Sequence, residues 1–254
     1  MTTPRYAFLD HPGPLAFAHR GGAGDWPENT MPAFEAAVAA GYRYLETDVH
    51  VTADGVLLAF HDEALDRVTD RMGLIRELPW STVREARVDG REPIPVFEEL
   101  LLAFPEARFN IDPKHDSAVD ALAQVIRSTG AIDRVNIASF SDRRIARLRE
   151  LLGLELCTGM GPKAIARLRA ASFGAPSAPF SAACVQVPVG HGRAVIVDER
   201  FVRTAHRLDL QVHVWTIDDA TEMARLLDLG VDGLMTDLPL VLKQVLVDRS
   251  QWVP

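Results

Sequence analysis

An α/β fold of the TIM-like (β/α)8 barrel type is the class that the sequence predicts, on three observations. The chain has 254 residues, which is about the usual length of such a barrel. Short apolar runs rich in β-branched residues alternate with helical patterns through its second half, as expected of parallel βαβ units. Eight such runs occur in the whole chain, enough to close a parallel sheet on itself.

The elements follow one another in a regular order. We expect strands at 15–19, 44–50, 109–112, 134–139, 154–158, 183–187, 211–216 and 233–236. Helices are expected at 30–40, 96–103, 118–129, 142–152, 162–171, 198–208, 219–229 and 240–247. A doubly wound open sheet is the competing fold, but Gly21-Gly22-Ala23-Gly24 after the first strand does not continue as G-x-G-x-x-G.

The stretch between the second and third strands has a mixed pattern. We expect a small insertion there, at about 62–108, and a segment of that length is usually functional or a small subdomain. No linker or change of composition divides the chain, so one domain is expected over 1–254.

Composition excludes some function classes. The net charge is −8, which disfavours a nucleic-acid partner but allows a small phosphate substrate in a locally positive pocket. Cys157 and Cys184 lie in apolar segments, so we expect buried thiols in a reducing compartment and no thiolate zinc site. No signal peptide is expected in 1–14, and no apolar run reaches the ~20 residues of a transmembrane helix. A cytoplasmic location is the default expectation, and the oligomeric state is not indicated.

Candidate catalytic residues follow the strands, because active sites of parallel barrels lie at the carboxyl ends of the strands. His19 and Arg20 end the first strand, and His61 follows the apolar run at 56–60. Two histidines beside carboxylates form an acid/base constellation; the alternative for each is a structural histidine. Asn29 or Thr30 is expected to cap the first helix.

The second strand places Glu46 and Asp48 on one face, because side chains alternate along a strand. Two adjacent buried carboxylates repel, and a hard divalent cation such as Mg2+ or Ca2+ relieves that repulsion. The alternative is neutralisation by Arg or Lys. Asp112 and Lys114 share a face at the end of the third strand. Asp112 could complete a metal site and Lys114 could hold a phosphate oxygen, or the two could form a simple ion pair.

Trp215 ends the seventh strand. We expect it either to line a substrate pocket at the barrel mouth or to fill the core.

These motifs together resemble the glycerophosphodiester phosphodiesterases. The resemblance covers about 15–247 and is most specific near the N-terminus. It rests on His19-Arg20-Gly21, Pro27-Glu28-Asn29-Thr30, Glu46-x-Asp48, Asp54-Gly55, His61-Asp62, Ile94-Pro95, Glu98-Glu99-Leu100-Leu101, Val214-Trp215-Thr216, Gly230-Val231-Asp232-Gly233 and Thr236-Asp237.

The resemblance implies a (β/α)8 barrel that hydrolyses glycerophosphodiesters to glycerol phosphate and an alcohol, with one divalent metal ion (Mg2+ or Ca2+, with Mn2+ possible) and two histidines. It also implies that the insertion is the small inserted subdomain of the family. The implied roles are His19 and His61 as catalytic residues, Glu46, Asp48 and Asp112 as metal ligands, and Arg20 and Lys114 as phosphate-binding residues.

One position departs from the family pattern. The family usually has Glu where this chain has Asp112, which is shorter by one methylene, and Pro113 follows it. This departure bears on how tightly the expected metal site binds its ion and on which ion it prefers.

Two other functions remain open. A lysophospholipase D-like enzyme acting on lysophospholipids would need an exposed apolar surface near the barrel mouth, supplied by 176–180 or by the insertion. A non-catalytic phosphate-binding barrel would show damage to the catalytic set, which is complete here. The head group, the acid and base roles of the histidines, and the choice between water and a substrate hydroxyl as nucleophile are not indicated.

Overall fold

A parallel sheet curves into a barrel in the computed structural model, which describes residues 6–192 and 194–254. The strands lie in the order β8-β7-β6-β2-β1-β13-β12-β9, and a parallel bridge between Gly159 and Cys184 brings the two ends together. The predicted barrel is confirmed. Its strands are β1 (Leu15–Ala18), β2 (Tyr44–Val51), β6 (Arg108–Pro113), β7 (Val135–Ile137), β8 (Cys157–Thr158), β9 (Cys184–Val187), β12 (Gln211–Val214) and β13 (Gly233–Thr236).

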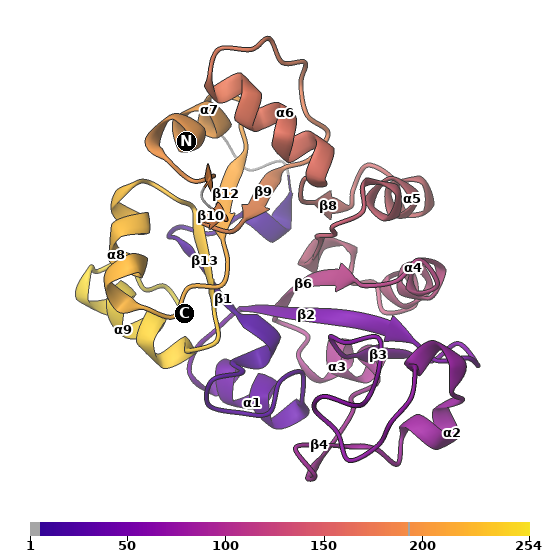
Figure 1. Ribbon diagram of the computed structural model, residues 1–254. Coiled ribbons are helices and arrows are strands. Elements are labelled where there is room, and N and C mark those ends of the chain that lie inside the picture. The colour runs from indigo at the N-terminus through magenta and orange to yellow at the C-terminus, as the bar shows by residue number, and fades with distance from the viewer. Residues whose placement is uncertain (1–5, 193) are drawn as a thin grey trace.

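Helices surround the strands (Figure 1). They are amphipathic: α4, for example, turns Val119, Leu122 and Ile126 to the core. The helices α5, α7 and α8 begin at side chains that accept a hydrogen bond from a backbone N–H of the first turn. The helices of the barrel are α1 (Met31–Ala39), α3 (Phe97–Ala103), α4 (Ala118–Ser128), α5 (Asp142–Leu152), α6 (Pro162–Ser172), α7 (Glu199–Arg207), α8 (Ala220–Asp228) and α9 (Pro239–Asp248).

The N-terminal turn η1 (Ala7–Leu9) packs on one end of the barrel. The ring of Phe8 meets the ring of Tyr44 edge-on, with 5.4 Å between the ring centres. The ring centres of Phe17 and Tyr44 are 5.2 Å apart. These rings form a second hydrophobic cluster that also contains both cysteines. Burial of the cysteines is therefore confirmed, and burial raises the pKa of Cys184 to about 12. None of the described helices is long and apolar enough to cross a membrane.

Several strands are shorter than expected. The first strand ends at Ala18, because His19 already lies in the 3-10 turn η2 (His19–Gly21). The fifth strand begins at Cys157 rather than at 154, since Leu154 is 81% exposed in the turn after Gly153. The apolar run at 56–60 forms a further strand, β3 (Leu57–Ala59), antiparallel to β2. Helix ends differ from those expected by at most one residue.

The chain between β3 and α3 folds against the mouth of the barrel, at the lower right of Figure 1. Its buried side chains make a separate cluster of Leu58, Phe60, Leu65, Ile75, Val83, Ala86, Val88 and Ile94. Its elements are η3 (Ile75–Glu77), α2 (Trp80–Val83), β4 (Arg87–Val88) and β5 (Glu92–Pro93). Two smaller features complete the chain, η4 (Ile132–Arg134) and a hairpin of β10 (Gly190–His191) and β11 (Ala194–Val195).

Candidate functional site

A cleft of about 280 Å³ opens at the carboxyl ends of the barrel strands. All the side chains singled out from the sequence line it: His19, Arg20, Glu46, Asp48, His61, Asp112, Lys114 and Trp215. A larger groove of about 470 Å³ lies between α5 and α6, but its lining contains one carboxylate and no histidine. Acid/base chemistry therefore points to the cleft at the strand ends.

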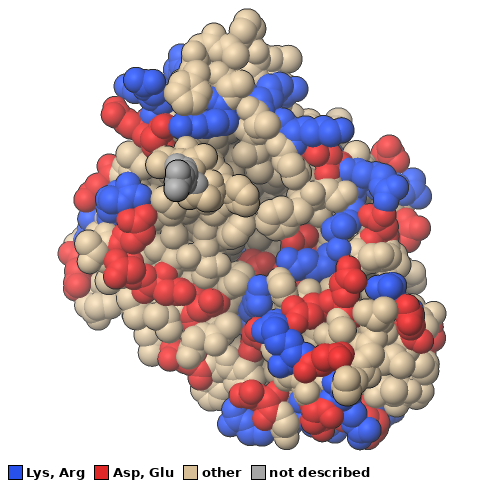
Figure 2. Space-filling model, in the orientation of Figure 1, with Lys and Arg blue, Asp and Glu red and all other residues tan. Residues whose placement is uncertain are grey.

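The cleft has a charged half and an apolar half. The charged groups lie on or just after β1, β2, β3 and β6. The apolar half lies after or beside β7, β8 and β12 and consists of Phe140, Met160, Ile165 and Trp215. Figure 2 shows Lys and Arg beside Asp and Glu along one side of the central hollow and residues of other kinds opposite. Trp215 therefore lines the cleft, and its ring meets the exposed ring of Phe140 at 5.8 Å. Phe140 was missed, although it too follows a strand end.

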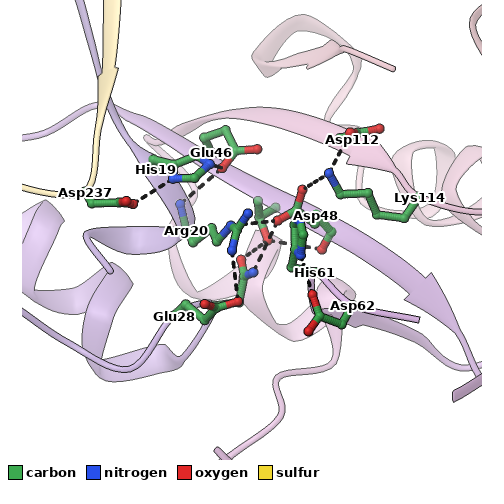
Figure 3. Close-up of polar contacts among 12 residues, drawn as sticks. His19, Arg20, Glu28, Glu46, Asp48, His61, Asp62, Asp112, Lys114 and Asp237 are labelled. Atoms are coloured by element: carbon green, nitrogen blue, oxygen red, sulfur yellow. Dashed lines mark hydrogen bonds and ion pairs between the residues drawn. The ribbon is translucent and has the colours of Figure 1, made fainter. Parts of the chain in front are cut away.

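His19 is the first residue of the turn that leaves β1. Its Nδ1 lies 2.7 Å from Asp237 Oδ1, and its Nε2 lies 3.7 Å from Glu46 Oε2 (Figure 3). Burial lowers the pKa of His19, but the charges of Glu46 and Asp237 and the hydrogen bond to Asp237 outweigh it, so the pKa is raised. The turn packs so closely on α1 that a Cβ at Gly21 (φ +83°) would come within 2.8 Å of the Ala33 side chain.

His61 is held in the same manner. Its Nδ1 lies 2.5 Å from Asp62 Oδ1. Burial raises the pKa of Asp62, but hydrogen bonds from Arg67 and His61 outweigh it and lower the pKa to about 2. A carboxylate that accepts from Nδ1–H selects the tautomer whose Nε2 is free to exchange a proton. In both histidines of the cleft a carboxylate therefore contacts Nδ1, which leaves Nε2 as the nitrogen available to exchange a proton.

Three buried carboxylates surround two cations (Figure 3). Lys114 Nζ lies 2.8 Å from Asp48 Oδ1 and 2.9 Å from Asp112 Oδ2. Arg20 Nε lies 3.3 Å from Asp48 Oδ2, and the Arg20 backbone N–H donates to Glu46 Oε2 at 3.1 Å. These contacts include the predicted Asp112–Lys114 ion pair and extend it to Asp48.

The carboxylates differ in how well they are compensated. Burial and the neighbouring charge of Asp48 raise the pKa of Glu46 to about 7. Burial also raises the pKa of Asp112. Burial acts the same way on Asp48, but Lys114 and Arg20 outweigh it and its pKa is lowered. Negative charge is therefore under-compensated at the Glu46 and Asp112 ends of the cluster.

The donor chemistry fits a hard divalent cation. In the described part of the chain, no three His, Cys, Asp or Glu side chains converge as a ready metal site. Lys114 contacts both Asp48 and Asp112. Asp112 Oδ1, however, is buried without any hydrogen-bond partner, and a buried charged oxygen without a partner is costly. All-oxygen donors suit Mg2+, Ca2+ or Mn2+.

Asn29 and Thr30 do not cap α1, contrary to expectation. Thr30 stands at the N-cap position, but its hydroxyl donates to the Pro27 carbonyl at 2.7 Å. Asn29 is buried with φ +55° and turns toward β2. Its Nδ2 lies 3.5 Å from Asp48 Oδ2, and its Oδ1 accepts from the Thr47 hydroxyl at 2.7 Å. Asn29 thus helps to position Asp48, a role that local helix-capping preference cannot indicate.

Comparisons with known proteins show the family to which the chain belongs. The model of the "Glycerophosphoryl diester phosphodiesterase family" matches residues 19–241. A Mycobacterium tuberculosis protein named "Probable glycerophosphodiester phosphodiesterase 2" is 38% identical over 98% of this chain and 97% of its own. A lysophospholipase D of Rattus norvegicus is 28% identical over 92% of this chain and 86% of its own.

A solved structure has the same fold. It is an Oleispira antarctica phosphodiesterase in complex with the product sn-glycerol-3-phosphate, and it superposes with a TM-score of 0.79 at 22% identity, covering 92% of this chain and 97% of the other. The family model spans nearly the whole barrel and begins at His19, the first residue of the cleft. The chain belongs to the glycerophosphoryl diester phosphodiesterase family.

Proposed function

We propose that this phosphoric diester hydrolase cleaves glycerophosphodiesters to glycerol phosphate and an alcohol, using two histidines and one divalent metal ion. The observation that supports this most is the cleft itself. It combines two histidines, each tied through Nδ1 to a carboxylate, with a buried group of three carboxylates and two cations. The Mycobacterium tuberculosis relative and the product complex from Oleispira antarctica point to the same substrate class.

The charged half of the cleft would bind the phosphate. Arg20 and Lys114 bring fixed positive charge to the place where the phosphoryl group becomes more anionic in the transition state. Glu46, Asp48 and Asp112 would hold Mg2+, Ca2+ or Mn2+. Such an ion polarises a phosphoryl oxygen as a Lewis acid.

The histidines would move the protons. One Nε2 removes a proton from the nucleophile, either water or a substrate hydroxyl, as its oxygen bonds to phosphorus. The other Nε2 donates a proton to the leaving oxygen as its bond to phosphorus breaks. Asp237 and Asp62 keep the two rings in the orientation that this exchange requires.

Substitution of each histidine tests the proposal. We expect His19→Ala and His61→Ala each to lower kcat by roughly 10²–10⁴-fold, as is typical for loss of a general acid or base. His206→Ala is the control, because this exposed histidine on α7 pairs with Asp232 outside the cleft. Turnover is measured on a panel of glycerophosphodiesters with Mg2+, Ca2+ and Mn2+ in turn. Near-wild-type turnover in both cleft variants would overturn the mechanism, and full activity after exhaustive chelation would overturn the role of the metal.

A lysophospholipase D activity is the second candidate, favoured by the apolar half of the cleft and by the Rattus norvegicus relative. The segment 176–180, considered as a lipid-facing surface, does not line the cleft, because it follows α6 on the way back to the start of β9. Phe140, 69% exposed at the mouth, is the apolar group in place to meet an acyl chain. Turnover of glycerophosphocholine against lysophosphatidylcholine separates the two activities.

A further inference from the structure

Arg67 joins two carboxylates beside the cleft without lining the cleft itself. Its Nε and Nη2 donate to the two oxygens of Asp62 at 2.5 and 3.1 Å. Its Nη1 and Nη2 donate to the two oxygens of Glu28 at 3.0 and 2.7 Å. The guanidinium is therefore bidentate toward both partners. Only the planar fork of arginine can make this arrangement, since a lysine ammonium is a single point of charge.

Each of these carboxylates also holds a residue of the cleft. Asp62 Oδ1 lies 2.5 Å from His61 Nδ1, and Glu28 Oε1 accepts from Arg20 Nη1 at 3.1 Å. A continuous hydrogen-bonded path therefore runs from His61 to Arg20 by way of Asp62, Arg67 and Glu28. Its two ends belong to different parts of the fold, the turn after β1 and the segment after β3.

The path has a physical consequence for both ends. Asp62 and Glu28 are partly buried, with side chains 23% and 14% exposed, and both direct negative charge toward the same half-exposed guanidinium. Without Arg67, these two charges would repel each other, and neither carboxylate would keep its second anchor. His61 and Arg20 would then each lose a support, because His61 contacts Asp62 and Arg20 contacts Glu28, although Arg20 would keep its contact with Asp48.

We propose that Arg67 is a positioning residue that fixes the tautomer and direction of the His61 ring and, through Glu28, the direction of the Arg20 guanidinium. The proposal rests on the proposed function in so far as His61 and Arg20 act on the phosphodiester. The proposal extends that function by giving the segment between β3 and α3 a part in catalysis. The segment contributes Arg67, which holds His61 and Arg20 in fixed positions relative to each other.

Kinetics of Arg67→Lys provide the first test. The variant keeps the charge but not the fork, and we expect kcat to fall on the order of 10–100-fold, as small misplacements of catalytic groups do. Arg84→Ala is the matched control, since Arg84 lies in the same segment and its exposed side chain forms an ion pair with the exposed Glu85. Arg67→Lys should cause a smaller loss in an Asp62→Asn background than in the wild-type protein, because the part of its effect that passes through Asp62 is already gone. A wild-type kcat in Arg67→Lys, or a full multiplicative loss in the double variant, would overturn the proposal.

A spectroscopic readout separates this proposal from the proposed function. The 15N resonances of the His61 ring report its tautomer with no need for turnover. In the wild-type protein and in Arg84→Ala we expect the proton fixed on Nδ1; in Arg67→Lys we expect a mixture of tautomers, with the His19 signals unchanged. If wild-type protein hydrolyses no glycerophosphodiester, the proposed function fails while the tautomer comparison still stands. Unchanged His61 signals in a folded Arg67→Lys variant would rule out the positioning role.

Discussion

Asp112 is the residue at which this chain departs from the family pattern, which usually has the longer Glu. In the structure, only one of the two Asp112 carboxylate oxygens has a partner. One carboxylate oxygen accepts from Lys114 at 2.9 Å, whereas Oδ1 is buried without a partner. Burial raises the pKa of this carboxyl, so its charge is incompletely compensated in the present arrangement. A cation placed near Oδ1 would supply what Lys114 alone does not.

Substitution at Asp112 therefore tests the metal site directly. We expect Asp112→Asn to weaken binding of Mg2+ or Mn2+ at least tenfold, because even partners outside the coordination shell cost 10–100-fold in affinity. Asp112→Glu should retain binding, since it restores the usual carboxylate length. Isothermal titration with each ion measures the affinity, and Asp116→Asn is the control because Asp116 pairs with Arg143 and Arg144 outside the cleft. An unchanged affinity in Asp112→Asn would show that Asp112 is not a ligand.

At the scale of the strands, the barrel interior contains a polar ladder below the cleft. Asn136 on β7 and Gln186 on β9 both donate to Asn110 Oδ1 on β6, at 2.6 and 2.9 Å. Gln186 Nε2 in turn lies 3.2 Å from His213 Nδ1 on β12. The ladder links strands from opposite sides of the barrel. Two of its members, Asn110 and Gln186, also line the cleft. The floor of the cleft is thus held by buried hydrogen bonds rather than by apolar packing alone.

His213 makes this ladder sensitive to pH. Burial lowers its pKa from 6.5 to about 3. Between these values the unfolded chain binds a proton at this position and the native chain does not, so the free energy of unfolding decreases as the pH falls below 6.5. The expected slope from this residue is about 1 kcal/mol per pH unit between pH 6 and 5.

Urea unfolding at pH 7, 6 and 5 measures that slope. His213→Gln removes the titrating group but keeps a polar side chain, so its free energy of unfolding should depend less on pH, by about 1 kcal/mol per unit. His191→Gln serves as the control because His191 is exposed on β10. Equal slopes in the wild-type protein and in His213→Gln would contradict the assignment.

At the scale of the whole molecule, the barrel could be predicted because the alternation of strand and helix patterns can be recognised from short stretches of sequence. Each strand and each helix is a short apolar pattern, and the order of the patterns determines the topology. The cleft could be predicted for the same reason: once strand ends are located, parallel pairing brings His19, Glu46 and Asp112 to one edge. The apolar pattern does not fix the strand ends, as at Leu154, since a turn with φ > 0° at Gly153 competes with an apolar run.

What the sequence did not indicate are contacts between distant segments. Asp237 pairs with His19 across 218 positions, and Glu28 meets Arg67 across 39. Asn29 illustrates the limit, because its local signal is that of a helix cap while its actual partners lie on β2. The residues of the cleft could be named from strand ends, but the residues that orient them depend on how the loops pack above the barrel.

The strands of the barrel are paired over different lengths. The β2–β6 ladder pairs six residues on each strand, from Tyr44–Arg108 to Val49–Pro113. By contrast, β8 pairs only two of its residues with β7. Within the described chain, β8 contacts β9 through the bridge at Gly159 and through backbone hydrogen bonds such as that from the Met160 N–H to the Cys184 carbonyl. The β8–β9 seam is therefore the part of the barrel with the shortest ladders.

Short ladders open at lower free energy than long ones, because fewer hydrogen bonds break together. We expect the amides of Cys157 and Thr158 to exchange with deuterium faster than those of Glu46 and Thr47, although all four residues are buried. Hydrogen exchange followed by mass spectrometry of peptides from β8 and β2 measures the difference. Since Met160 at the end of β8 lines the apolar half of the cleft, opening here would widen that half while leaving the histidines and carboxylates in place. Equal protection of the two peptides would show instead that the barrel opens only as a whole.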